Sequence, residues 1–126
     1  MKRILIQDKT LSLDTLDSIK DFVEGDFKEK TVEVDFASCL SEIRREPTDY
    51  NLIICHPHIR PRSCCIPYLV RANESNVPMV FTYKTITKGF EELEAMSDQF
   101  KIELKYRFPL DHTFYIDLIR SLEDKI

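Results

Sequence analysis

Glycine is scarce in this chain of 126 residues, which contains only two glycines. Phosphate-binding loops need several glycines, and neither a glycine-rich loop nor a P-loop lysine motif can be written anywhere in the sequence. Nucleotide binding through these motifs is therefore excluded. Long apolar runs are also missing. The longest apolar runs have only the length of a strand, and this excludes a membrane-spanning helix. We expect no signal peptide, since Met1-Lys2-Arg3 leads directly into one of these short runs.

An excess of positive charge is missing as well. The sequence has 18 lysines and arginines against 22 aspartates and glutamates, which gives a formal net charge of -4. Nucleic acids and anionic membranes are bound through basic patches, and none is visible, so we expect neither as a partner. The composition, 43% hydrophobic and 32% charged, is typical of a globular protein. We expect one domain over residues 1–126, in the cytoplasm.

Cysteines are too few, and the chain too long, for the disulfide framework of a small secreted protein, so we expect reduced thiols. The four cysteines are Cys39, Cys55, Cys64 and Cys65. A candidate cluster for zinc or copper(I) is formed by Cys55, His56, His58, Cys64 and Cys65. Its spacing matches no standard zinc motif, and successive side chains of a strand point to opposite faces. We therefore expect no metal ion and no other cofactor.

A short run of apolar residues, Leu52 to Cys55, is the strongest structural signal in the sequence. It is too short for a helix and is bounded by prolines, so it predicts a central strand buried on both faces. A similar run, Ile4 to Ile6, predicts the first strand and is soon followed by Asp8. In open α/β sheets the functional site lies beyond the carboxyl ends of such strands. His56 therefore stands where chemistry would take place.

The rest of the chain alternates between strand and helix patterns. Further strands are predicted over residues 31–36, 77–82 and 101–106, and helices near Leu13, Leu40 and Ile43, Cys64, Phe90 and Asp111. Side chains suited to cap helices are Ser12, Ser63, Thr87 and Asp111. Five strand–helix units with short connections predict a parallel sheet with helices on both faces. We therefore predict a doubly wound, flavodoxin-like α/β/α sandwich.

In length, order of elements and local motifs, the chain resembles the CheY-like receiver domain of two-component response regulators. The matching segments are Ile4-Leu5-Ile6-Gln7-Asp8, Asn51-Leu52-Ile53-Ile54-Cys55-His56, Val77-Pro78-Met79-Val80-Phe81-Thr82 and Phe108-Pro109-Leu110-Asp111. The resemblance extends over essentially the whole length. It implies a receiver fold and a role in signal transduction.

The departures from the family pattern fall on its phosphorylation site. The resemblance places the phospho-acceptor aspartate on His56, the second magnesium-binding acid on Lys9, and the phosphate-contacting lysine on Phe108, whereas Asp8 and Thr82 match. Magnesium requires several oxygen ligands, so one carboxylate beside an ammonium group is a poor site. We expect Lys9 to pair with Asp8 instead. The interpretation is a pseudo-receiver with a degenerate pocket that is not phosphorylated on aspartate.

Such a protein would be a regulatory module that contacts protein partners of a signalling pathway and is not an enzyme. The resemblance implies that the fourth helix, fifth strand and fifth helix form the interaction surface. Tyr106 lies near the family's switch aromatic, and Phe114 and Tyr115 are further candidates for this face. The last strand and helix are also the candidate surface for a homodimer.

Three alternative functions stay open. His56 is placed for a phospho-acceptor or a general base, and Cys55 for a nucleophile, so a flavodoxin-like enzyme or phosphocarrier is one alternative. Metal binding by the cysteine and histidine cluster is another. The third is binding of a small ligand in the altered pocket. The interpretation that we prefer is that His56 fills the vacated pocket and bonds a neighbouring carboxylate such as Asp8.

Overall fold

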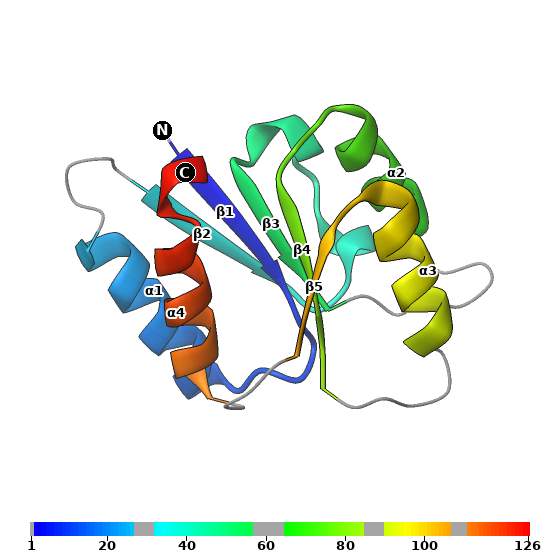
Figure 1. The fold of residues 1–126 in the computed structure, drawn as a ribbon. Helices are drawn as coiled ribbons and strands as arrows, with labels where there is room; N and C mark the ends of the chain where they lie inside the picture. The colour runs from blue at the N-terminus through cyan, green and yellow to red at the C-terminus, as the bar shows by residue number, and fades with distance from the viewer. Residues whose placement is uncertain (1, 27–31, 57–64, 85–89, 107–110) are drawn as a thin grey trace.

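Five parallel strands form the sheet of the computed structural model, which describes residues 2–26, 32–56, 65–84, 90–106 and 111–126. The strands are β1 (Lys2–Gln7), β2 (Val32–Ala37), β3 (Leu52–Cys55), β4 (Met79–Tyr83) and β5 (Glu103–Tyr106). They are ordered β2-β1-β3-β4-β5, and every neighbouring pair runs parallel (Figure 1). The predicted flavodoxin-like sheet is confirmed, with β2 at an edge as its alternating pattern indicated.

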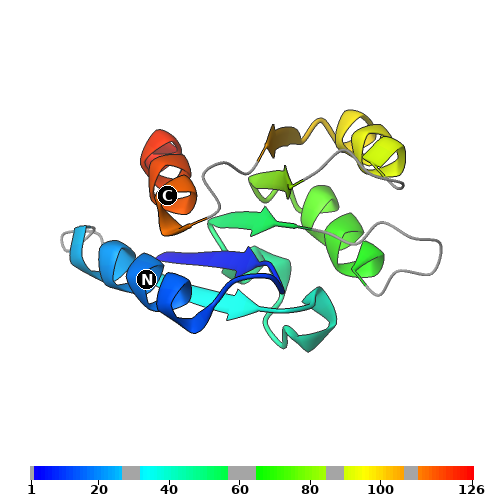
Figure 2. The same cartoon turned by 90° about the horizontal axis from the view of Figure 1, so that it is seen from below.

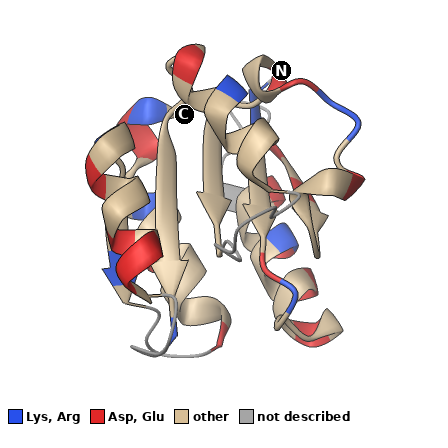
Figure 3. Ribbon diagram, turned by 90° about the vertical axis from the view of Figure 1, so that its right-hand side faces the viewer, with Lys and Arg blue, Asp and Glu red and all other residues tan. Residues whose placement is uncertain are grey.

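Helices cover both faces of the sheet. They are α1 (Leu13–Asp26), α2 (Ile66–Glu74), α3 (Phe90–Phe100) and α4 (His112–Ser121). Figures 1 and 2 show α1 and α4 together on one face and α2 and α3 on the other. Figure 3 shows that charged residues lie mainly on the helices and turns, whereas the strands between the helix layers carry few of them. Among the described helices, none is both long and apolar enough to cross a bilayer.

The two hydrophobic cores follow from the alternation of side chains along the central strands. Ile54 of β3 packs in the core on the α1 and α4 side, whereas Ile53 and Cys55 pack in the core on the α2 side. All four residues of β3 are buried, as the apolar run predicted. Each fully buried isoleucine or leucine side chain contributes about 1.5–3 kcal/mol through removal of its surface from water. Burial of these side chains therefore stabilises the centre of the sheet.

The connection between β2 and β3 differs from the prediction, because the expected helix with Leu40 and Ile43 is not an α-helix. The chain forms two short 3-10 turns there, η1 (Leu40–Glu42) and η2 (Pro47–Asp49). A residue before proline is disfavoured in the α conformation, and Glu46 is extended, with φ -71° and ψ 151°. Two apolar positions are also too few to form a buried helical stripe. The described residues therefore form five strands but four α-helices.

Two of the predicted helix caps are present. The Ser12 hydroxyl oxygen accepts a hydrogen bond from the Thr15 backbone N–H at 3.2 Å, at the start of α1. The Asp111 carboxylate accepts one from the Thr113 N–H at 2.9 Å, at the start of α4. Both side chains satisfy donors that the first turn of a helix leaves open. The other two predicted caps, Ser63 and Thr87, lie outside the described residues.

Candidate functional site

The carboxyl ends of β1, β3 and β4 bring three of the predicted site residues together. Asp8 follows β1, His56 follows β3, and Thr82 lies near the end of β4. Parallel pairing continues past the strands, because the His56 N–H donates to the Gln7 carbonyl at 2.8 Å and the Asp8 N–H donates to the Ala37 carbonyl at 3.1 Å. The backbone ladder therefore fixes where the Asp8 and His56 side chains begin.

Asp8 is buried, with 6% of its surface exposed, and both of its carboxylate oxygens accept hydrogen bonds. Oδ1 accepts from the Thr10 N–H at 2.9 Å and from the Thr10 hydroxyl at 2.6 Å. Oδ2 accepts from the hydroxyl of Tyr115 on α4 at 2.7 Å. Burial opposes ionisation, but the hydrogen bonds from Thr10 and Tyr115, with a smaller effect of His56, hold the pKa of Asp8 below its usual value. The site therefore contains a carboxylate whose charged form is favoured by the hydrogen bonds from Thr10 and Tyr115.

His56 is bonded to a hydroxyl and not to the expected carboxylate. Its Nδ1 lies 3.2 Å from the Thr82 Oγ1, and the tautomer of the ring decides which atom donates. The Thr82 hydroxyl also lies 3.5 Å from the Cys55 carbonyl oxygen. The expected hydrogen bond between His56 and Asp8 is absent from the described part of the chain, because Asp8 is bonded by Thr10 and Tyr115 instead.

The expected pairing of Lys9 with Asp8 is wrong. Lys9 is exposed, and no ion pair between Lys9 and Asp8 is found among the described residues. The Asp8 carboxylate already accepts hydrogen bonds from Thr10 and Tyr115, and an exposed ammonium group stays hydrated at little cost. Phe108, the fifth residue predicted for this pocket, lies outside the described residues.

Cys55 lies in a different environment from His56, as their neighbouring positions in the strand predicted. Its side chain is completely buried, and its thiol donates a hydrogen bond to the Gln7 Oε1 at 3.0 Å. Burial, together with the nearby Cys65, Asp8 and Cys39, raises the pKa of Cys55 well above its usual value. The thiolate is the reactive form of cysteine, so this residue is poorly suited to nucleophilic catalysis at neutral pH.

The candidate metal cluster is only partly covered by the structure. His58 and Cys64 lie outside the described residues, which include Cys55, His56 and Cys65. Within the described ranges, no group of three histidine, cysteine, aspartate or glutamate side chains is close enough to hold a metal ion.

The candidate interaction face is only partly exposed. Tyr106 at the end of β5 has 54% of its surface exposed. Its ring centroid lies 5.4 Å from that of Tyr83, whose ring lies 4.9 Å from that of Phe90. Phe114 and Tyr115, in contrast, are buried at 8% and 0% exposure, so their assignment to a surface is wrong. They belong to the apolar stripe of α4 that packs on the sheet and α1.

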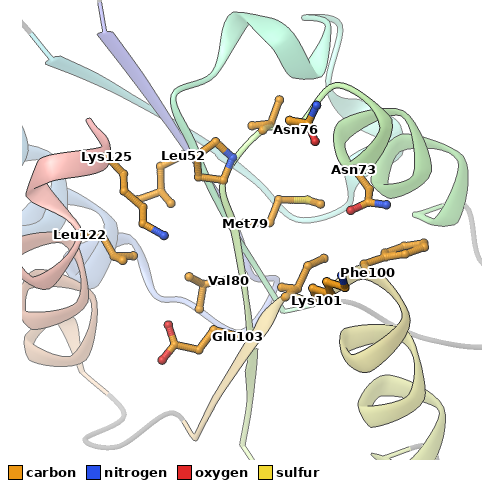
Figure 4. Close-up of a pocket in the computed structure, with 13 residues that line it drawn as sticks. Leu52, Asn73, Asn76, Met79, Val80, Phe100, Lys101, Glu103, Leu122 and Lys125 are labelled. Atoms are coloured by element: carbon orange, nitrogen blue, oxygen red, sulfur yellow. The ribbon is translucent and has the colours of Figure 1, made fainter.

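A cavity of about 290 Å³ lies at the opposite edge of the sheet, where β3, β4 and β5 begin (Figure 4). Leu52, Met79 and Glu103, the first residues of these strands, line it. Lys101 and Lys125 lie at its sides. The cavity is therefore separated from Asp8 and His56 by the length of the strands, and it is not the altered pocket that the sequence predicted.

The fold class follows from this geometry: a parallel sheet ordered β2-β1-β3-β4-β5, with α1 and α4 on one face and α2 and α3 on the other, is a CheY-like, flavodoxin-like fold. The chain is similar to the non-phosphorylated HemR receiver domain of Leptospira biflexa, with 14% identity, a TM-score of 0.58, and coverage of 99% of this chain and 94% of that one. It is also similar to the chemotaxis protein CheY4 of Vibrio cholerae, with 12% identity, a TM-score of 0.53, and coverage of 100% and 99%. At these identities the likeness establishes the fold. The chain matches no protein-family model and no curated protein.

Three residues of the site were not predicted from the sequence. Thr10 had a local signal, because an aspartate often accepts a hydrogen bond from the backbone two residues later. Tyr115 had none, since it is 107 residues from Asp8 and reaches it only through the packing of α4. Gln7, whose amide joins the Cys55 thiol to the Ser38 carbonyl, read simply as the end of a strand.

Proposed function

We propose that this chain is a pseudo-receiver, a non-catalytic regulatory module of signal transduction that acts through protein contacts. The receiver fold supports the general class. The residue types at the carboxyl edge of the sheet support the finer assignment, because an imidazole stands at the end of β3, where receivers carry the aspartate that accepts phosphate.

One observation carries the proposal, namely the bonding of Asp8. Its two oxygens are held by Thr10 and Tyr115, and its neighbour across the ladder is His56, which bonds Thr82. Magnesium needs several oxygen ligands in a nearly octahedral arrangement. Phosphoryl transfer also needs cations that neutralise the oxygens of the phosphoryl group. Among the described residues, the Asp8 carboxylate and the His56 imidazole supply little of this, which supports a structural role for the site.

The first test is a titration with a phosphate mimic. We expect amide NMR spectra of the wild type to stay unchanged with magnesium and beryllofluoride, separately and together, since an acyl phosphate cannot form on His56. The matched control is the triple variant Lys9→Asp, His56→Asp, Phe108→Lys, which restores the residue types of a working receiver. We expect this variant to show saturable shifts that require magnesium. Saturable, magnesium-dependent shifts at Asp8 and Thr82 of the wild type would show that the proposal is wrong.

The proposed contact surface is centred on Tyr106. The side chain of Tyr106 is 54% exposed, and burial of its apolar surface by a partner would favour binding. Its packing with Tyr83 and the contact of Tyr83 with Phe90 join the end of β5 to the start of α3. Exposed acidic side chains of α3 are Glu91, Glu92, Glu94 and Asp98. A partner segment with apolar and basic side chains matches this surface.

The homodimer is tested on the same surface with two matched variants. Tyr106→Ala removes the exposed ring, whereas Leu13→Ala removes another large exposed apolar side chain, which is 77% exposed and lies on α1. If the chain dimerises through β5 and α4, sedimentation velocity over a concentration series will show weaker association for Tyr106→Ala and no change for Leu13→Ala. Equal weakening by both variants would contradict this location.

A further inference from the structure

Three free cysteines of the described residues gather at the carboxyl ends of the strands, on the α2 side of the sheet. Cys39 follows β2, Cys55 ends β3, and Cys65 immediately precedes α2. The sulfur atoms of Cys39 and Cys65 are 4.0 Å apart, although the residues are 26 positions apart in the sequence. A disulfide bond requires sulfur atoms about 2.05 Å apart, so the two sulfurs need to approach by only about 2 Å. Rotation of one side chain about its Cα–Cβ bond supplies a movement of this size.

The surroundings of the pair favour reaction at Cys39. Its side chain is partly exposed, whereas Cys65 has only 2% of its surface exposed. The Ser41 hydroxyl donates a hydrogen bond to the Cys39 sulfur at 3.1 Å, which stabilises negative charge on it. Cys65 occupies the N-cap position of the nine-residue helix α2, where the positive end of the helix dipole lies. An oxidant therefore reaches Cys39 first, with the sulfur of Cys65 directly behind it.

Cys55 is excluded from this reaction by its own contacts. It is completely buried, and its thiol donates to Gln7 at 3.0 Å. Gln7 in turn donates to the Ser38 carbonyl at 2.8 Å, which holds the segment next to Cys39 against the end of β1. The hydrogen bonds of Gln7 to Cys55 and to Ser38 therefore hold Cys55 in place and position the segment that carries Cys39.

We propose that Cys39 and Cys65 form a reversible intramolecular disulfide when the protein meets a hydroperoxide. The Cys39 thiolate attacks the peroxide, the O–O bond breaks, and a sulfenic acid forms while the remaining oxygen leaves as hydroxide or alkoxide and takes a proton from the solvent to give water or an alcohol. The Cys65 thiolate then attacks the Cys39 sulfur, the S–S bond forms, the S–O bond breaks, and hydroxide leaves and takes a proton to give water. A dithiol reductant returns both thiols by exchange.

The disulfide links the segment after β2 to the start of α2, beside the pocket that contains Asp8 and His56. This link is independent of phosphoryl chemistry, so it stands whether or not the proposed function is correct. Closing a loop between residues 39 and 65 removes conformational freedom from the unfolded chain and is expected to raise the thermal midpoint by ~10 °C. Transient disulfides of this kind occur in reducing compartments as responses to oxidants.

The test uses the full chain, reduced, freed of reductant, and treated with equimolar hydrogen peroxide at low protein concentration. We expect intact mass spectrometry to show a monomer that has lost two hydrogen atoms, and reduction with dithiothreitol to restore it. Peptide mapping should join Cys39 to Cys65. The control variant Cys64→Ser retains the bond, whereas Cys39→Ser and Cys65→Ser lose it, and only Cys65→Ser accumulates sulfenic acid or its oxidation products at Cys39.

Several results would overturn the proposal. One is a wild type that remains fully reduced while its accessible thiols are oxidised to sulfinic acid. Another is a bond that persists in Cys65→Ser but disappears in Cys64→Ser, which would assign it to the neighbouring cysteine. Because mapping of the wild type and of Cys64→Ser already decides between these outcomes, the test does not depend on the stability of the other variants. A disulfide found only between two chains would equally contradict it.

Discussion

Removal of a single oxygen atom tests how the candidate site is held together. Tyr115→Phe deletes the hydroxyl that donates to the Asp8 Oδ2 at 2.7 Å and keeps the ring in the core. Tyr115 is completely buried and Asp8 is 6% exposed, so water cannot easily replace the lost donor. Asp8 then retains the two hydrogen bonds from Thr10 as its described partners.

The size of the effect follows from the charge on the acceptor. A hydrogen bond to a charged group contributes about 1.5–3 kcal/mol, and a bond between neutral groups about half of that. We therefore expect Tyr115→Phe to lower the free energy of unfolding by about 1.5–3 kcal/mol at pH 7. In the background of Asp8→Asn, which removes the charge, the same substitution should cost about 1 kcal/mol.

The pH dependence has a definite sign. The pKa of Asp8 is lower in the folded protein than in the unfolded chain, so its contribution to stability is present above the unfolded pKa and is lost as the pH falls through the folded pKa. Tyr115→Phe raises the folded pKa of Asp8 towards its usual value. The variant should therefore show a weaker loss of stability on acidification, although it starts from a lower value.

The assays are urea unfolding between pH 3 and 8, and NMR titration of the Asp8 carboxyl. Tyr83→Phe is the control, because it removes the same atom from a half-buried ring that packs on Phe90 and Tyr106. We expect it to change stability by less than about 0.5 kcal/mol. A cost of Tyr115→Phe no larger than that of the control, together with an unchanged pKa of Asp8, would refute the reasoning.

Further predictions concern stability and are measured by urea unfolding. Asp111→Ala removes the cap of α4 and should lower the free energy of unfolding, with Asp111→Asn close to the wild type; equal losses from the two variants would argue against capping. Ile54→Ala opens a cavity in the fully buried centre of the sheet and should cost about 2–5 kcal/mol, whereas a cost below 1 kcal/mol would contradict the described packing. Tyr50→Phe removes a donor to the Asp35 carboxylate at 2.8 Å and should cost about 1–2 kcal/mol, an effect that should vanish in Asp35→Ala, which has no acceptor.

The order of the elements was predictable because strands and helices leave local traces in a sequence. The apolar run of β3 indicated a strand buried on both faces, and the alternation in β2 indicated a strand buried on one face. Both predictions were confirmed. The helix expected around Leu40 was wrong, since two apolar residues ahead of Pro47 carry too little information to separate an α-helix from a 3-10 turn.

The side chains of the site were harder to predict than its position. The carboxyl ends of β1, β3 and β4 meet in any sheet of this order, so Asp8, His56 and Thr82 were expected together and lie together. Their hydrogen-bond partners were not predicted. Lys9 was expected to pair with Asp8 because the two are adjacent in the sequence, yet Lys9 is exposed in the fold. Short separation along a chain does not imply that two side chains meet.

Local periodicity and turn residues, which the sequence alone contains, determined the parallel sheet, the location of the site and most of the core. The tertiary structure decided that Tyr115 bonds Asp8, that Phe114 and Tyr115 are core and not surface, and that Cys39 lies beside Cys65. The physical reason is that these contacts join residues 26 and 107 positions apart in the sequence, so they depend on how the helices pack on the sheet. A local sequence pattern contains no information about such packing.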